Sequence, residues 1–173
     1  MAMAPGTGRP LLFLDVDGPL IPFGIPPGEL PAYPGPRDDD SHPGLARMNP
    51  EHGRRLVALP YELVWATAWE HEANEWVAPR IGLPQLPVVA WPDLPAPDEE
   101  EDERLGLHWK TRTIIEWAAG RPFAWVDDEV TAVDQAWVRA QHPGPALLHR
   151  VNPRLGLSED DFQLLRQWLH DIR

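Results

Sequence analysis

Short apolar segments alternate along this chain with segments whose apolar residues recur every three or four positions. The apolar segments occupy residues 9–16, 61–66, 86–91, 123–126 and 146–149, and the helical patterns occupy 49–59, 69–80, 108–119, 131–141 and 158–171. Continuous apolar runs are typical of strands buried on both faces, and strands that alternate with helices predict a parallel sheet between two helical layers. We therefore expect an α/β protein, a three-layer α/β/α fold with a mainly parallel sheet of about five strands.

Two segments interrupt this alternation. Residues 20–50 are rich in proline and glycine, which predicts a flap or loop on the surface. Residues 92–106 contain the acidic run Asp98–Glu103, which favours a solvated acidic loop. The length of 173 residues suits one domain. We therefore expect a single domain over residues 1–173, with both segments as insertions in it.

Composition narrows the function classes. The chain has no cysteine, which excludes a thiol nucleophile and a thiolate zinc site, and its formal net charge is −12. Such a charge disfavours broad nucleic-acid binding, unless arginines such as Arg37, Arg47 and Arg104 face the phosphate backbone of the nucleic acid. The apolar runs are too short to span a membrane, and the first residues lack a secretory pattern. We expect a soluble, cytoplasmic protein without a membrane partner.

Reactive side chains gather at the ends of the predicted strands. Asp15 and Asp17 follow the first strand, Thr67 follows the second, and Asp127 and Asp128 follow the strand at 123–126. A lysine, at position 110, stands at the start of the helix before that strand. The carboxyl ends of parallel strands share one edge of a sheet, where ligands bind in open α/β folds. The sequence therefore predicts one site built from four separate segments.

These residue types suit phosphoryl transfer. Of two carboxylates two positions apart, one can act as nucleophile while the other serves as general acid and base. Crowded carboxylates favour a hard divalent cation, of which Mg²⁺ is the natural candidate. Lys110 and Thr67 would hold the phosphoryl oxygens by charge and hydrogen bond.

The ordered motifs resemble those of the haloacid dehalogenase-like (HAD) superfamily of phosphohydrolases. They are Leu12-Phe13-Leu14-Asp15-Val16-Asp17-Gly18-Pro19-Leu20, Leu63-Val64-Trp65-Ala66-Thr67, Lys110 at a helix start, and Phe123-Ala124-Trp125-Val126-Asp127-Asp128. The stretches after Trp65 and Trp125 are similar to a small group that includes HAD domains associated with RNA repair. The resemblance implies a Rossmann-like HAD fold and a phosphatase.

The resemblance also implies a role for each matching residue. Asp15 would be the nucleophile that forms an aspartyl-phosphate, and Asp17 the acid and base whose backbone carbonyl also binds Mg²⁺. Asp15, Asp17, Asp127 and Asp128 would form the metal site. Asp128 is favoured over Asp127 as the direct ligand, and the reverse assignment stays open. Thr67 and Lys110 would hold the phosphate.

The resemblance further implies an open site, because neither irregular segment resembles a folded cap domain. Uncapped members of the superfamily act on large phosphates or rely on a partner, so the substrate would be a phosphorylated small molecule or a phosphorylated nucleic-acid end. Trp69 and Trp91 could line its entrance and stack on a ring. The alternative is a catalytically silent binding module that keeps the metal site and holds a protein partner. Dehalogenation fits less well, because a departing halide needs no acid at Asp17.

Other patterns point to no site. His71-Glu72-Ala73-Asn74-Glu75 begins like the helix of a zinc protease, but position 75 is not the required second histidine. The seven histidines show no short metal-ligand spacing, so we expect no zinc site. Most of the nine tryptophans fall on apolar faces and are expected in the core.

Overall fold

The computed structural model describes residues 8–33, 35, 42–93 and 96–173. In this part of the chain, four parallel strands form one sheet in the order β2-β1-β3-β4. They are β1 (Leu11–Leu14), β2 (Glu62–Trp65), β3 (Phe123–Asp127) and β4 (Ala146–Arg150). The expected α/β architecture with a parallel sheet is confirmed. Because β1 lies between β2 and β3, the residues after β1 stand in the middle of the carboxyl edge.

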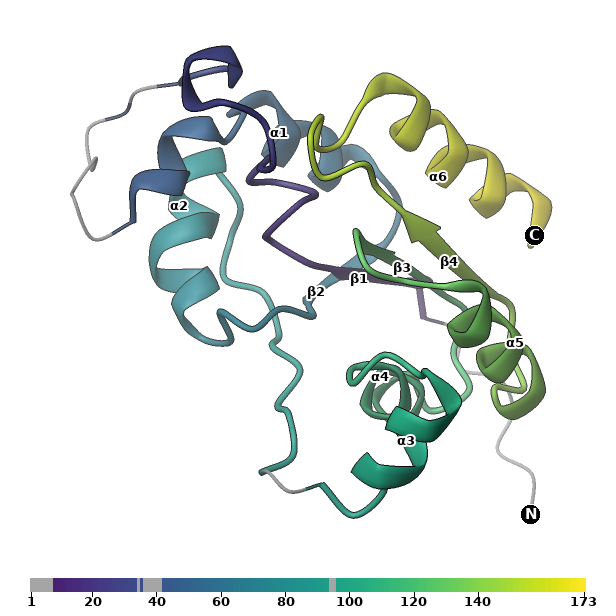
Figure 1. Ribbon diagram of the computed structural model, residues 1–173. Helices are drawn as coiled ribbons and strands as arrows, with labels where there is room; N and C mark the ends of the chain where they lie inside the picture. Colours follow the sequence, from purple (N-terminus) through teal and green to yellow (C-terminus); the bar gives the residue numbers. More distant parts are fainter. Residues whose placement is uncertain (1–7, 34, 36–41, 94–95) are drawn as a thin grey trace.

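Helices cover both faces of the sheet (Figure 1). One side carries α1 (Glu51–Ala58), α2 (Ala78–Ile81) and α6 (Glu159–Asp171), and the other carries α3 (Glu99–Leu105), α4 (Thr111–Ala118) and α5 (Ala132–Gln141). Leu12 of β1 belongs to the buried cluster of the first side with Leu56, and Phe13 belongs to that of the second side with Ile114. Successive residues of a strand point to opposite faces, so a strand between two helical layers must be apolar throughout.

The expected strand over residues 86–91 is not formed, although all of these residues are described. Val88 makes a single parallel bridge to Trp65. The N–H of Trp65 donates to the Pro87 carbonyl and the N–H of Val89 donates to the Trp65 carbonyl, both at 2.9 Å. Pro87 has no N–H to extend this ladder toward the start of β2. The prediction of a strand over 86–91 was therefore wrong, and the sheet has four strands in the described residues.

The acidic segment forms the helix α3 where a loop was expected. Four of its five acidic residues stand in the first turn, where negative charge is favoured by the helix dipole. Arg112 of α4 pairs with Glu101 at 2.8 Å and with Asp102 at 2.6 Å, and Gly106 ends the helix at a φ of 70°. No residue of α3 is buried. Charge pairing and the terminal glycine therefore hold a helix that has no apolar face in the core.

The proline-rich segment contains two short helical turns, η1 (Pro27–Glu29) and η2 (Pro43–Arg47). Arg37 lies outside the described residues. The helix expected over 69–80 is formed only from residue 73 onward, as the π-helix η3 (Ala73–Val77) followed by α2. In the described part of the chain, every helix is too short or too polar to cross a lipid bilayer.

Candidate active site

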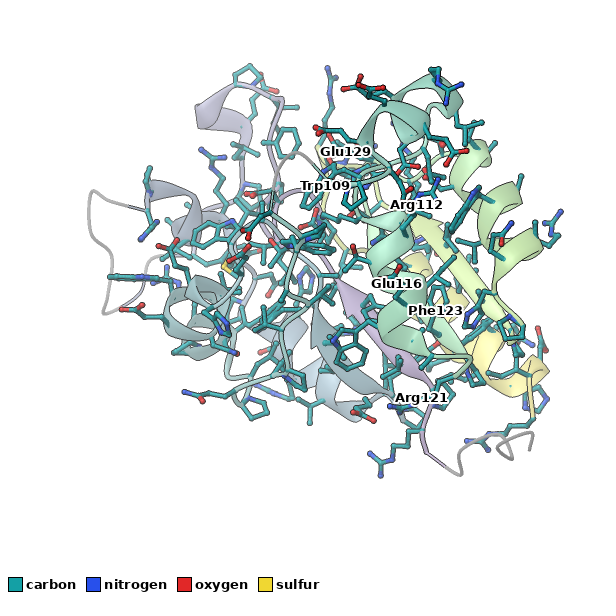
Figure 2. The ribbon with its side chains drawn as sticks, turned by 90° about the horizontal axis from the view of Figure 1, so that it is seen from below. Trp109, Arg112, Glu116, Arg121, Phe123 and Glu129 are labelled. Atoms are coloured by element: carbon teal, nitrogen blue, oxygen red, sulfur yellow. The ribbon has the colours of Figure 1, made fainter. Side chains whose placement is uncertain are left out.

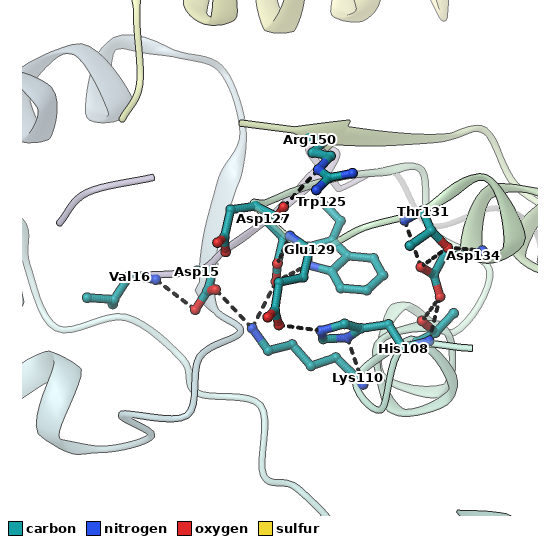
Figure 3. Close-up of polar contacts among 12 residues, drawn as sticks. Asp15, Val16, His108, Lys110, Trp125, Asp127, Glu129, Thr131, Asp134 and Arg150 are labelled. Carbon is teal, nitrogen blue, oxygen red and sulfur yellow. Dashed lines mark hydrogen bonds and ion pairs between the residues drawn. The ribbon is translucent and has the colours of Figure 1, made fainter. Parts of the chain in front are cut away.

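Polar residues from three segments meet at the carboxyl edge of the sheet (Figure 3). Asp15 follows β1, Asp127 ends β3, and Lys110 directly precedes α4. Lys110 Nζ lies 3.1 Å from Asp15 Oδ2 and 2.8 Å from Asp127 Oδ2. The three residues are 3% (Lys110), 7% (Asp15) and 0% (Asp127) exposed. The structure thus places three of the predicted site residues in direct, buried contact.

The carboxylate of Asp127 is held on both oxygens. Oδ1 accepts a hydrogen bond from the Glu129 N–H at 2.9 Å, and Oδ2 accepts one from the Trp125 indole at 3.2 Å in addition to that from Lys110. Asp128 is buried beside it, and its backbone carbonyl accepts a hydrogen bond from Arg150. Asp15, Asp127 and Asp128 each offer a carboxylate oxygen, and these atoms lie within 4.8 Å of one another.

The start of α4 is fixed by Asp134, a residue to which the sequence analysis assigned no role. Asp134 Oδ1 accepts hydrogen bonds from the His108 N–H and the Thr111 hydroxyl, both at 2.8 Å. Its Oδ2 accepts one from the Thr131 N–H at 2.8 Å, within the capping box of α5. Asp134 therefore ties the first turns of α4 and α5 together and sets the position of Lys110. The Thr131-x-x-Asp134 pattern of a capping box was the available signal.

Sequence reasoning also missed His108 and Glu129. The His108 Nδ1 accepts a hydrogen bond from the Lys110 N–H at 3.2 Å, and its Nε2 lies 3.1 Å from Glu129 Oε2. His108, Asp127 and Glu129 form a second group of possible metal-ligand atoms within 4.8 Å of one another. Spacing along the chain could not reveal this group, because its members come from two segments that only the fold brings together.

Trp69 joins the remaining two predicted residues, Asp17 and Thr67. The Trp69 indole N–H donates to Asp17 Oδ2 at 2.9 Å, while its backbone N–H donates to Thr67 Oγ1 at 3.2 Å. Thr67 is fully buried, and the Ala66 N–H before it donates to the Leu14 carbonyl, so this segment continues β2 along the end of β1. The exposed carboxylate of Asp17 is therefore oriented by Trp69 and is separate from the buried carboxylate group.

Gly18 lets the turn after β1 pass close to Asp128. Its φ is +92°, and a Cβ at this position would lie 2.7 Å from the Asp128 Cγ. Both the backbone conformation and the contact require glycine. The Asp-Val-Asp-Gly pattern therefore places Asp128 against the same turn that carries Asp15 and Asp17.

Burial and crowding dominate the electrostatics of the site. Burial raises the pKa of Asp15 to about 7, Lys110 opposes this shift, and the charge of Asp127 adds to it. Burial, and next the charge of Asp127, also raise the pKa of Asp128. Burial alone would lower the pKa of Lys110, but the charges of Asp15 and Asp127 outweigh it and raise that pKa. Negative charge is thus in excess at this edge.

The donor set fits a hard divalent cation such as Mg²⁺. Three carboxylates, of Asp15, Asp127 and Asp128, and one ammonium, of Lys110, give −3 + 1 = −2 when all four are charged. A divalent cation would neutralise that charge, and the ligand atoms offered are the oxygens that Mg²⁺ prefers.

The two ends of α4 face different surroundings (Figure 2). Trp109 and Glu129 lie at the end that meets the site, whereas Arg121 lies at the opposite end and pairs with Glu62 at 2.6 Å. Trp109 is 50% exposed, and its ring centroid lies 5.4 Å from Lys110 Nζ. Trp91, expected at an entrance, packs edge-on against Trp109 and donates its indole N–H to the Thr67 carbonyl at 2.9 Å.

Comparison with family models gives a match over residues 11–162, to the HAD domain in Swiss Army Knife RNA repair proteins. Comparison with curated proteins and with solved structures found no match. The matched range begins at β1 and reaches into α6, so it contains the whole sheet and every site residue described above. This chain belongs to the family of HAD domains found in Swiss Army Knife RNA repair proteins.

Proposed function

We propose that this HAD domain is a Mg²⁺-dependent phosphatase that works through an aspartyl-phosphate on Asp15. The observation that carries the proposal is the buried contact of Lys110 with Asp15 and Asp127, with an oxygen of Asp128 inside the same group. Asp15 Oδ1 accepts a hydrogen bond from the Val16 N–H at 2.8 Å. A carboxylate held on one oxygen by the backbone and on the other by an ammonium is fixed in orientation for attack.

In the first step, an Asp15 oxygen attacks phosphorus and the bond from phosphorus to the leaving oxygen breaks. Protonated Asp17 gives its proton to that leaving oxygen. In the second step, Asp17 takes a proton from water as the water oxygen attacks phosphorus. The bond between Asp15 and phosphorus then breaks, which releases phosphate and restores both carboxyl groups. Lys110 and Thr67 donate hydrogen bonds to the phosphoryl oxygens throughout.

Asp15, Asp128 and the backbone carbonyl of Asp17 would hold the Mg²⁺ ion. Bound Mg²⁺ would neutralise part of the negative charge on the carboxylates and on the phosphoryl oxygens of the substrate. Asp128 is favoured as the direct ligand of its pair, because both oxygens of Asp127 already accept hydrogen bonds from protein donors. Asp127 would then act by holding Lys110.

The family description supports a phosphorylated nucleic-acid end as the substrate, since it names RNA repair proteins. Such an end is a phosphate monoester, which suits the chemistry assigned to Asp15 and Asp17. The net charge of −12 restricts the contact to a local one at the site.

Release of phosphate from p-nitrophenyl phosphate, sugar phosphates, nucleotides and phosphorylated oligonucleotide ends tests the proposal. We expect turnover in Mg²⁺ and its loss when EDTA removes the metal, together with a rise in melting temperature on Mg²⁺ addition. Full activity in EDTA would overturn the proposal. Metal-loaded protein that is silent on the whole panel, yet retains a partner in pull-downs, would favour a binding module instead.

Replacing Trp69 by Phe should lower kcat about 10- to 100-fold. The variant removes the donor to Asp17 Oδ2, and a hydrogen bond to a charged group contributes about 1.5–3 kcal/mol. Because Trp69 acts by positioning Asp17, the loss should appear in kcat more than in KM.

A double-mutant cycle with Asp17→Asn checks this assignment. The Trp69 replacement should cost almost nothing further once the carboxylate is absent. Trp76→Phe is the matched control, because both indoles pack against His42, whereas it is the Trp69 indole that donates to Asp17. Equal losses in the Trp76 and Trp69 variants would show that the ring acts only through packing.

A further inference from the structure

A hollow of about 410 Å³ adjoins Asp17 on the side of the proline-rich segment. Its walls include Phe23, His42, Arg47 and Trp69, so it collects two aromatic side chains and one arginine beside this carboxylate. The volume lies within the range of about 300–1,000 Å³ that small-molecule sites occupy. It therefore has room for the organic part of a phosphate ester.

The position of Asp17 indicates what enters this hollow. In the proposed mechanism Asp17 protonates the leaving oxygen, so the group attached to that oxygen must extend into the space that Asp17 lines. We propose that this space is a subsite for a nucleotide leaving group that keeps a second phosphate, with its base beside Phe23 and Trp69 and that phosphate at Arg47. The inference rests on the proposed function and specifies its substrate.

Two aromatic residues supply the surface for the base. Phe23 is 39% exposed, although most large apolar side chains of the described residues are buried. Its N–H donates to the Pro153 carbonyl at 2.8 Å, which anchors the loop on the segment after β4. Trp69 is anchored by Asp17 and Thr67. Stacking of a base on an aromatic side chain contributes about 1–3 kcal/mol without demanding a particular base.

Arg47 supplies the charge for the second phosphate. Its Nη1 donates to the Pro22 carbonyl at 3.1 Å, so the guanidinium is tied to the residue that precedes Phe23. A planar guanidinium binds phosphate through paired hydrogen bonds. The chain as a whole is acidic, with a net charge of −12, but Arg47 places a positive charge in the same hollow as Asp17. This local positive charge favours an anionic leaving group.

A second hollow, of about 580 Å³ at Trp91 and Trp109, is less suitable for this phosphate. Its described lining contains the carboxylates Glu70, Glu99, Asp102 and Glu103 and neither lysine nor arginine. Four carboxylates repel an anionic group. Of these two hollows, the one that contains Arg47 is therefore the better match in charge to an oligonucleotide.

Three phosphate esters separate the contributions of base and second phosphate. Ribose 5-phosphate has neither group, a mononucleotide has only the base, and a dinucleotide with one terminal phosphate, at its 5′ or at its 3′ end, has both. We expect kcat/KM to rise along this series, with about a 10- to 100-fold step from mononucleotide to dinucleotide. That last step should shrink as salt is added.

Arg47→Gln should remove the step between mononucleotide and dinucleotide, and Arg47→Lys should restore part of it. Arg104→Gln is the matched control, because it makes the same charge change on α3, where Arg104 donates to the Glu100 carbonyl. Phe23→Ser should reduce the step between ribose 5-phosphate and mononucleotide. Equal kcat/KM for mononucleotide and dinucleotide, or equal effects of the Arg47 and Arg104 variants, would overturn the subsite.

Binding of the same esters to the Asp15→Asn variant, measured by calorimetry, separates the subsite from the catalytic proposal. Preferential, Arg47-dependent binding of the dinucleotide by this variant, together with no hydrolysis of any ester by the unaltered protein, would support the subsite and refute the phosphatase. Turnover of all three esters at one rate would support the phosphatase and refute the subsite. If Asp15→Asn binds the three esters equally and the unaltered protein hydrolyses none of them, both the subsite and the phosphatase are refuted.

Discussion

Asp15→Asn should abolish phosphate release, with kcat lowered by roughly 10⁴-fold or more, because the amide oxygen is a poor nucleophile. The fold should survive, since Lys110 keeps its 2.8 Å contact with Asp127. Steady-state release of phosphate in Mg²⁺ measures the first expectation, and the melting temperature measures the second. A covalent phosphate, trapped by acid quench and located by mass spectrometry, should be found on Asp15 of the active protein alone.

Asp160→Asn, an exposed position in the first turn of α6, is the matched control and should retain turnover. Beryllium fluoride, a mimic of the phosphoryl group on a carboxylate, should raise the melting temperature of the unaltered protein in Mg²⁺ and leave that of Asp15→Asn unchanged. Turnover by the Asp15 variant within tenfold of the unaltered protein would exclude Asp15 as the nucleophile. Release of halide from a haloacid by the unaltered protein would point to dehalogenation instead.

Lys110→Met should remove activity and also destabilise the protein by about 3–5 kcal/mol. Lys110 is 3% exposed and contacts Asp15 and Asp127, so its loss leaves two carboxylates buried without their common cation. Chemical denaturation measures the loss of stability. Mg²⁺ should recover part of it, because the formal charge of the site becomes −3 and the cation then replaces the missing positive charge.

Arg112→Gln, two residues further along in the first turn of α4, gives the comparison. Arg112 pairs with Glu101 and Asp102 at the surface of α3, where ion pairs contribute about 1 kcal/mol or less each. The Arg112 variant should therefore lose little stability and should keep its activity. If Lys110→Met proves as stable as Arg112→Gln, the contacts among Lys110, Asp15 and Asp127 do not hold the site together as we describe.

The site residues that could be predicted are those that stand at the end of a buried strand or at the start of a helix. Asp15 and Asp127 are such residues, since a buried apolar run fixes where each strand ends. The strand expected over 86–91 failed because Pro87 lacks the donor that an extended ladder needs. The helix α3 was missed because its stability comes from the dipole, from Arg112 of another helix and from Gly106, and not from an apolar face.

The sequence by itself determined the α/β class, the single edge where the reactive residues gather, and the chemistry that carboxylates, a lysine and a threonine can perform there. Only the tertiary structure decided which residues come together: Lys110 contacts Asp15 and Asp127, Trp69 donates to Asp17, and Arg47 lines the same hollow as Asp17. The physical reason is that periodicity and turn chemistry act over a few residues. Contacts between distant segments depend instead on how two helical layers pack against one sheet, which no local pattern encodes.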